Sequence, residues 1–423
     1  MTDVSESGFK QVTRVDDARA RLRDAVSPHG RTDRVPLRVA EGRALAEPVT
    51  AVLDVPHYAR AAMDGWAVRA EDTFGAGDRS PAVLREAGDD GPVGPNEAVR
   101  VHTGSELPEG ADAVVMIEHT DRVPRSETDS ANGETVSDRF GEEVEVFDAV
   151  AGGENVAPPG EDVAADQPLF EPGHRLRPSD LGLLKATGIR EVAVYERPTA
   201  GVIPTGEELV QGDPEPGEVV ETNGLTVSRY VERWGGAATY RNVVTDEESA
   251  LRAAIERDLT KDVVVTTGGS SVGERDLVPD VVSDLGEVLV HGVALKPGHP
   301  AALGVVKGTP VLLLPGYPVA CIVNAVQFLR PVLKWAGGYP LPDQPTVEAR
   351  LSRKVASEPG VRTFARVSLD TEDGERVAAP TRASGSGVLS SVALADGWVV
   401  VPEGTEGYDE GRMVDVEDWE YYA

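Results

Sequence analysis

The chain has 423 residues, and its 72 aspartates and glutamates outnumber its 41 lysines and arginines, giving a formal net charge of -31. This charge excludes a general nucleic-acid binder, because phosphate backbones are bound by clustered lysines and arginines, and it argues against a basic membrane-surface protein. The length suggests two to four domains, and a hydrophobic fraction of 40% predicts a globular chain.

Lysine is rare in this sequence, since only seven of the 41 basic residues are lysines. Such an acidic composition is typical of proteins from a salt-rich (halophilic) cytosol, where screening weakens repulsion between like charges; an acidic protein from an arginine-biased genome is the alternative. The single cysteine, Cys321, excludes a disulfide framework and a Cys-based zinc finger. The first residues have no apolar signal region and no run of 18 apolar residues follows, so we expect a cytoplasmic protein with no membrane partner.

The first part of the chain is predicted to contain mainly strands and turns between two short helices, the second of them in SDLGLLKATG (179–188). Residues 15–26 have apolar residues at helical spacing after an acidic first turn, which predicts the first helix. The almost purely polar stretch 124–143 is expected to be an exposed loop. We expect an elongated N-terminal or linker domain formed by 1–50 and 149–188, with a β-rich domain over 51–148.

Strands alternate with helices in the second part of the chain. Apolar runs such as DVVVTTGG and TPVLLLPG are separated by helical segments, and a long helix follows the last of them. This alternation predicts a three-layer α/β domain with a mostly parallel sheet over 189–338. No helix is expected after Gly338, where short strands and turns predict a C-terminal β-barrel domain over 339–423. The predicted fold class is therefore multidomain α/β plus β, with mixed N-terminal domains.

A glycine-rich loop, TTGGSSVGERD (266–276), follows a predicted buried strand and precedes a helix. Glycine lets the backbone approach an anion closely, so the N–H groups of such a loop can wrap around a phosphate. The loop has neither the Walker GK[ST] pattern nor GxGxxG, and a tight turn without a ligand is the alternative. Its candidate binding residues are Gly268, Gly269, Ser270, Ser271 and Gly273.

Three carboxylates follow the carboxyl ends of predicted strands: Glu208, Asp246 and Asp276. Because these ends share one edge of a parallel sheet, the three side chains are expected to converge there. Converging carboxylates favour a hard divalent cation, which offsets their mutual repulsion. The alternatives are a helix N-cap for Asp246 and a solvated loop position for Glu208.

Two Pro-Gly-x-Pro turns follow apolar strands, one in VALKPGHPAALG (293–304) and one in LLLPGYPVA (312–320). Proline-flanked turns hold the backbone with little conformational entropy left to lose. Lys296 lies in the first turn, and a lysine beside an anion-binding loop fits a phosphate or oxyanion ligand. His299 either assists it or is a surface residue.

Two further turns lie in the β-rich domain. Asp64 occurs in AAMDGWA, and Thr103 occurs in HTGSELPEGAD. Their chemistry alone predicts well-specified turns with no ligand.

Nine motifs, in this order along nearly the whole chain, resemble those of the molybdopterin molybdenumtransferase family, which is MoeA-like and includes the gephyrin E domain. They are GRALAEPV, AAMDGWA, HTGSELPEGADAVVMIE, GENVAPPGED, IPTGEEL, TTGGSSVGERD, ALKPGHPAALG, LPGYPVA and GSGVLSSVALADGW. The resemblance implies a homodimer of elongated four-domain subunits, with a MogA-like domain at about 189–338. It also implies adenylylated molybdopterin and molybdate as substrates, release of AMP with a divalent cation (Mg²⁺ or Zn²⁺), and insertion of the metal into the pterin dithiolene.

The resemblance assigns the phosphate and cation sites to the α/β domain. The 268–273 loop would hold the pterin phosphate and pyrophosphate. Where the family often has lysine, this chain has Gly292 and His299, which reduces the positive charge expected around molybdate. The implied cation ligands are Glu208, Asp246 and Asp276.

The resemblance also implies an active site between subunits. Asp64 and Thr103 of one chain would face the α/β domain of the other, where Lys296 would bind the oxyanion. The other implied substrate contacts are Pro300, Pro315, Gly316, Pro318, Arg366, and Ser390 or Ser391 of the C-terminal domain.

The implied partners are a second copy of the chain, a MogA/MoaB-like molybdopterin adenylyltransferase, and downstream cofactor-maturation proteins or molybdoenzymes. A tungstate-inserting paralogue and a non-catalytic pterin-binding scaffold are alternative functions. The adenylyl-transferring enzyme itself is a third, although the 190 N-terminal residues and the C-terminal β-domain argue against it.

Overall fold

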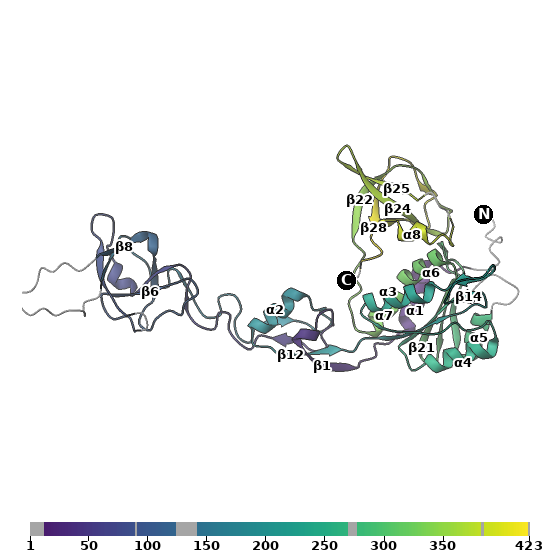
Figure 1. The fold of residues 1–423 in the computed structure, drawn as a ribbon, viewed down its shortest axis with the longest axis horizontal. Helices are drawn as coiled ribbons and strands as arrows, with labels where there is room; N and C mark the ends of the chain where they lie inside the picture. Colours follow the sequence, from purple (N-terminus) through teal and green to yellow (C-terminus); the bar gives the residue numbers. More distant parts are fainter. Residues whose placement is uncertain (1–11, 89–90, 124–141, 270–276, 382–384, 422–423) are drawn as a thin grey trace, which may run out of the picture.

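The structure is a computed structural model that describes residues 12–88, 91–123, 142–269, 277–381 and 385–421. It is elongated, with an α/β domain and a barrel at one end and a long arm that carries first a small domain and then a distal β domain (Figure 1). Most of the polar stretch predicted as a loop, residues 124–141, lies outside the described residues.

The first helix packs on the α/β domain and not on the small domain beside it. Helix α1 (Val15–Ala25) places Val15, Ala18 and Leu22 in the same hydrophobic core as the α/β strands. The predicted helix is therefore present. It packs in the core of the α/β domain, although the sequence led us to expect it in the N-terminal domain over 1–50. The small domain pairs β1 (Thr32–Pro36) antiparallel with β12 (Glu191–Tyr195) and is covered by α2 (Pro178–Ala186).

Two short ribbons lead from the small domain to the distal one. They pair β2 (Val49–Thr50) with β11 (Pro168–Phe170), and β3 (Arg60–Ala61) with β10 (Val156–Ala157). The distal domain is a curled six-stranded sheet around a core that includes Trp66. Its strands, in sheet order, are β7 (Ala113–Met116), β4 (Gly65–Val68), β6 (Glu97–Val101), β5 (Ala82–Glu86), β9 (Glu143–Val146) and β8 (Thr120–Val123).

The α/β domain has the predicted three layers. In sheet order its strands are β16 (Ala237–Tyr240), β13 (Thr199–Pro204), β17 (Val263–Thr267), β21 (Thr309–Leu314), β20 (Ala302–Val306) and β18 (Glu287–His291). Helices α1 and α3 (Asn223–Arg233) and the helix 318–336 cover one face, while α4 (Glu248–Asp258) and α5 (Leu277–Leu285) cover the other. Only β20 runs against the others, because it pairs antiparallel with both neighbours. The mostly parallel sheet is confirmed.

The β20–β21 hairpin is the part of this sheet that the alternation of strands and helices did not indicate. Its turn is Lys307–Gly308, and both residues have positive φ, 50° and 85°. A two-residue turn with positive φ at both positions matches the twist of antiparallel strands.

The long helix consists of α6 (Pro318–Asn324), a π-helical turn η5 (Ala325–Leu329) and α7 (Arg330–Ala336). It is long and apolar enough to cross a membrane by length and composition, but 94% of its apolar window is buried inside the protein. It is therefore a core helix. Arg19 of α1 donates a hydrogen bond of 2.7 Å to the Gln327 side chain in the π turn, which ties α1 to this helix.

The C-terminal domain is the predicted barrel. Its closed order is β24 (Arg362–Glu372), β25 (Glu375–Pro380), β22 (Thr346–Leu351), β28 (Met413–Glu417) and β26 (Gly397–Val401), which returns to β24. Strand β19 (Leu295–Lys296) of the α/β domain adds to β24 and docks the barrel. The expectation that helices end at Gly338 was wrong, because α8 (Ser390–Ala393) follows.

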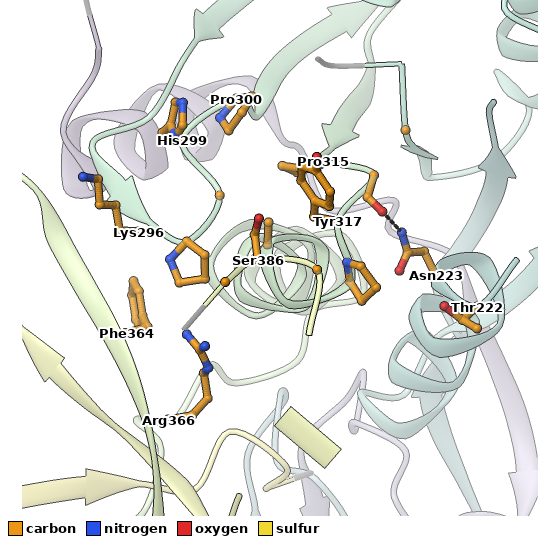
Figure 2. A pocket seen from close by; sticks show the side chains of 18 of the residues that line it. Thr222, Asn223, Lys296, His299, Pro300, Pro315, Tyr317, Phe364, Arg366 and Ser386 are labelled. Carbon is orange, nitrogen blue, oxygen red and sulfur yellow. Dashed lines mark hydrogen bonds between the residues drawn. The ribbon is translucent and has the colours of Figure 1, made fainter. Parts of the chain in front are cut away.

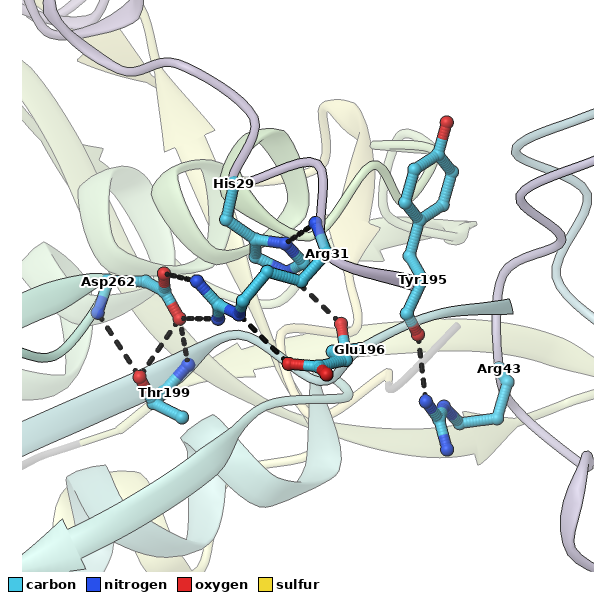
Figure 3. Close-up of polar contacts among 7 residues, drawn as sticks. All are labelled: His29, Arg31, Arg43, Tyr195, Glu196, Thr199 and Asp262. Atoms are coloured by element: carbon cyan, nitrogen blue, oxygen red, sulfur yellow. Dashed lines mark hydrogen bonds and ion pairs between the residues drawn. The ribbon is translucent and has the colours of Figure 1, made fainter. Parts of the chain in front are cut away.

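An arginine fixes the elbow between the small domain and the α/β domain (Figure 3). Arg31 donates to both carboxylate oxygens of Asp262, at 2.9 and 2.7 Å, and to Glu196 at 2.9 Å. The backbone N–H and hydroxyl of Thr199 also donate to Asp262, and these bonds lower the pKa of that carboxyl against the opposing effect of its burial. The base of the arm is therefore held by a charge-assisted network.

Candidate active site

A cavity of about 1230 Å³ lies between the α/β domain and the barrel. The ends of β13, β17 and β21 and both Pro-Gly-x-Pro turns form one wall, and β24 and residues 385–387 of the C-terminal domain form the other (Figure 2). The carboxyl edge of a parallel sheet is where α/β domains bind ligands. Every predicted α/β site residue that is described lies on this cavity; these are Glu208, Asp246, Gly268, Gly269, Lys296, Pro300, Pro315, Gly316 and Pro318.

Asp246 is on the acidic side of the cavity and is not the N-cap of α4. The N-cap is Glu247, which makes no side-chain capping bond within the described residues. One oxygen of Asp246, Oδ1, is buried and has no hydrogen-bond partner among the residues that the structure describes. Burial, and then the charges of Glu208 and Glu207, raise the pKa of Asp246. An unsatisfied carboxylate oxygen beside further carboxylates fits a hard cation.

The full predicted cation site is only partly placed by the structure. Glu208 and Asp246 line the same cavity, but Asp276 lies outside the described residues, as do Ser270, Ser271 and Gly273 of the glycine-rich loop. Within the described ranges, no group of three or more His, Cys, Asp or Glu side chains could hold a metal ion. Among the described residues, the carboxylates that could bind Mg²⁺ or Zn²⁺ here are Glu208 and Asp246, whose Oδ1 makes no hydrogen bond to them.

Two cavity residues at the start of α3 were missed in the sequence. Glu221 is only 5% exposed, and it accepts hydrogen bonds from the Gly224 N–H at 2.6 Å and from the hydroxyl of Tyr240. Asn223 donates from Nδ2 to the carbonyl of Gly316 at 2.6 Å. The sequence feature that could have indicated them is Glu-Thr-Asn (221–223), which follows β15 (Val219–Val220) and leads into the first residue of α3.

The glycines that open the anion loop are required by the backbone. Gly268 and Gly269 have φ of 127° and 67°. A Cβ at residue 268 would collide with the carbonyl oxygen of Thr205. These two positions therefore exclude other residues both by conformation and by space.

Basic groups line the side of the cavity that meets the barrel. Lys296 Nζ lies 2.6 Å from Glu358 Oε2. Burial, and then Lys296, lower the pKa of His299, so its neutral form is favoured near pH 7. Lys354 was missed in the sequence, because nothing local connects it with the α/β motifs. Arg366 lies here as predicted, and burial lowers its pKa.

The predicted serine contacts are not at the cavity. Neither Ser390 nor Ser391 is among its lining residues, and Ser391 is 5% exposed with its hydroxyl donating to the Val388 carbonyl at 2.7 Å. Both serines belong to α8, the short helix that follows the cavity-lining residues 385–387. The preceding residues Gly385, Ser386 and Gly387 line the cavity instead.

Asp64 and Thr103 are brought together, but far from the cavity of the same chain. The Thr103 N–H and hydroxyl donate to Asp64 Oδ1 at 2.6 and 2.8 Å, and these bonds lower the pKa of Asp64. Both residues are exposed on the distal domain, at the far end of the arm (Figure 1).

Comparison with protein families accounts for almost all of this architecture. Residues 13–188 match the MoeA N-terminal region (domain I and II), and residues 348–419 match the MoeA C-terminal region (domain IV). Residues 201–335, which hold the acidic side of the cavity, match a family described as a probable molybdopterin binding domain. The fold and site thus define a multidomain protein of the molybdopterin-binding class.

Full-length relatives narrow this class to one family. The chain is 33% identical to the molybdopterin molybdenumtransferase of Bacillus subtilis over 92% of this chain and 90% of the relative. It is 34% identical to molybdopterin molybdenumtransferase 2 of Mycobacterium tuberculosis over 91% and 94%. The crystal structure of a molybdopterin biosynthesis MoeA protein from Pyrococcus horikosii superimposes with a TM-score of 0.79 at 35% identity, covering 97% of this chain and 99% of that one. The chain belongs to the molybdopterin molybdenumtransferase (MoeA) family.

Proposed function

We propose that this protein is a molybdopterin molybdotransferase that takes adenylylated molybdopterin and molybdate, releases AMP and inserts the metal into the pterin dithiolene. The observation that carries the proposal is the division of charge in one cavity. Its acidic side is formed by Glu208, Glu221 and Asp246, and its basic side by Lys296, Lys354 and Arg366. Such a cavity suits a phosphorylated substrate with a cation at one end and an oxyanion at the other.

The α/β domain supplies the phosphate and cation chemistry. The backbone at Gly268 and Gly269 approaches the substrate phosphates, and Glu208 and Asp246 would hold Mg²⁺ or Zn²⁺ together with Asp276. A cation held there would neutralise negative charge on the phosphates. Cleavage of the phosphoanhydride by water leaves AMP and the pterin monophosphate.

The basic side supplies the oxyanion contact. Lys296 and Arg366 would hold molybdate while its oxygen ligands exchange for the two dithiolene sulfurs. Gly292 and His299 stand where the family often has lysine, and Lys354 of the barrel adds a positive charge to the same cavity. Tungstate as the preferred oxyanion is the second candidate function.

The distal pair completes the site in a homodimer. Asp64 and Thr103 are preorganised for each other and exposed, yet remote from the cavity of their own chain. A second copy whose arm reaches this cavity would bring them to the substrate. We further place the protein in a salt-rich cytoplasm, between a MogA/MoaB-like adenylyltransferase and downstream maturation proteins or molybdoenzymes.

Turnover of adenylylated molybdopterin at high salt tests the proposal. With Mg²⁺ or Zn²⁺ and either molybdate or tungstate supplied, we expect AMP release and a metal-loaded pterin, and metal analysis of that pterin gives the oxyanion preference. Asp246→Asn should lose AMP release, whereas Asp284→Asn, an exposed carboxylate paired with Arg252 outside the cavity, should retain it. Pterin binding by the wild type without AMP release would establish a scaffold instead.

A further inference from the structure

The charged residues that line the cavity can bind phosphates, a cation and an oxyanion, but they do not provide a binding surface for a flat ring. Adenylylated molybdopterin carries two nitrogen heterocycles, a pterin and an adenine. Their faces are apolar and bind to aromatic side chains by stacking, while their edges carry hydrogen-bonding groups. The cavity therefore needs an apolar, aromatic wall.

Tyr317 provides such a wall. It lies in the second Pro-Gly-x-Pro turn, lines the cavity and is 65% exposed. Two valines of β15 that line the same cavity, Val219 and Val220, are 54% and 40% exposed. Burial of large apolar side chains is favourable, so these three exposed side chains give the cavity apolar area that a bound apolar face can cover.

The backbone holds Tyr317 in place before any ligand binds. Its φ of -73° and ψ of 128° are extended, and Pro318 disfavours the helical alternative for the residue before it. The preceding Gly316 is held by the hydrogen bond from Asn223, at 2.6 Å. Tyrosine has only two side-chain torsions, so a tyrosine ring on a fixed backbone loses little entropy when a ligand binds.

The surroundings of the ring leave room for a ligand and offer groups to its edge. Gly387 lies beside one edge of the ring, because a Cβ built there would be 3.4 Å from Tyr317 Cδ1. The ring itself is 65% exposed, which leaves area for a ligand. In Figure 2, Tyr317 lies between Asn223 and Ser386. Asn223 uses its Nδ2 for Gly316 and keeps Oδ1 as an acceptor for a ring amino group, and Ser386 adds a hydroxyl.

We propose that Tyr317 is the stacking platform for a heterocyclic ring of the substrate, and that it determines recognition of that ring. The inference rests on the proposed function for its substrate class. Tyr317 would bind the ring by stacking, which the charged residues of the cavity do not provide, and it lies where the α/β domain meets the barrel.

The test compares Tyr317→Leu and Tyr317→Phe with the wild-type protein. Binding of neopterin and of AMP is measured by isothermal titration calorimetry, and ring stacking by quenching of neopterin fluorescence. Tyr317→Leu should weaken binding of the stacked ring about 10-fold, and Tyr317→Phe should bind within about twofold of the wild type. A loss confined to neopterin assigns the pterin, and a loss confined to AMP assigns the adenine. In turnover, KM should rise in Tyr317→Leu while kcat is retained.

Phe74→Leu is the matched control, because Phe74 is 69% exposed and lies on the distal domain. It should leave both Kd values unchanged. If the wild type binds a ring and Tyr317→Leu binds it equally well, the stacking role is overturned while the proposed function stands, even if that variant is less stable. If the wild type binds neither ring and releases no AMP, the proposed function fails and this inference fails with it.

Discussion

Lys296 of the α/β domain and Glu358 of the barrel form an ion pair of 2.6 Å at the cavity. The oxyanion contact predicted in the first Pro-Gly-x-Pro turn is therefore already occupied by a carboxylate of this chain. An incoming oxyanion has to compete with Glu358 for the same ammonium group. Both side chains are substantially exposed, 44% and 67%, so the pair contributes at most about 1 kcal/mol.

We expect Glu358→Gln to bind molybdate about two- to fivefold more tightly than the wild type, as measured by calorimetry at low salt. The difference should shrink as salt rises, since exposed charges are screened. Glu256→Gln is the control, because its partner Lys307, at 3.9 Å, is outside the cavity. An unchanged Kd in Glu358→Gln would show that Lys296 does not contact the oxyanion.

The neighbouring carboxylates of Asp246 and Glu208 repel each other, which lowers the stability of the metal-free protein, but the proposed reaction requires both. Asp246→Asn removes a charge that is partly buried beside another carboxylate, so the metal-free variant should have a higher Tm than the wild type. AMP release should fall about 100-fold or more, because one charged group of the reaction site is lost. Addition of Mg²⁺ should raise the Tm of the wild type and not of the variant. Equal stabilisation of both by Mg²⁺ would place the cation elsewhere.

The same substitution has a pH signature. The pKa of Asp246 is raised in the folded state by burial and by Glu208 and Glu207. The folded state therefore binds the Asp246 proton more tightly than the unfolded state does. The stability that comes from this protonation is lost as the pH rises through the folded pKa. The Tm advantage of Asp246→Asn should be absent near pH 4 and present at pH 7, in calorimetric scans without divalent metal.

Lys334 of α7 is completely buried, and within the described part of the chain its Nζ has no hydrogen-bond partner. Burial, and then Arg175 and Arg330, lower the pKa of Lys334 to about 7. An exposed lysine has a pKa of about 10.4. Burying the charged form of Lys334 therefore costs folding free energy, and this cost is largest below pH 7 and falls as the pH rises. Lys334→Met should raise the free energy of unfolding by about 2–4 kcal/mol at pH 6 and by much less at pH 9.5, in urea titrations. Lys185→Met, at an exposed position of α2, should change it little at either pH; a gain for Lys334→Met that is the same at both pH values would contradict this account.

The α/β half of the site could be predicted from the sequence because its determinants are local. Gly268 and Pro315 each follow directly after a strand of the α/β sheet, and parallel strands bring their carboxyl ends to one edge. Lys296 lies beside them in the first Pro-Gly-x-Pro motif, at the end of the short strand β19. The packing of α1 on that domain could not be predicted, because its apolar stripe shows that the helix is covered but not by which domain.

The barrel half was predicted poorly because it depends on tertiary closure. Lys354 and Ser386 reach the cavity only when β19 joins β24 and docks the barrel on the α/β domain. Ser391 does not line the cavity for a local reason, since its hydroxyl donates to the Val388 carbonyl three residues earlier; its contact with substrate stays a prediction. Glu221 lay beside a recognisable helix start, and its burial depends on the Tyr240 hydroxyl, which is remote in sequence.

Asp64 and Asp246 lie at opposite ends of the elongated chain, so a site that uses both must be assembled from two copies. Asp64→Asn and Asp246→Asn should each be inactive as homodimers. In a mixed dimer, one of the two sites combines wild-type Asp64 from one chain with wild-type Asp246 from the other. Random mixing of the two variants by co-expression should therefore restore about one quarter of the wild-type AMP release. A mixture of Asp246→Asn with Glu208→Gln should stay inactive, because both residues line the cavity of one chain; if the Asp64→Asn mixture is equally inactive, Asp64 does not act across the dimer.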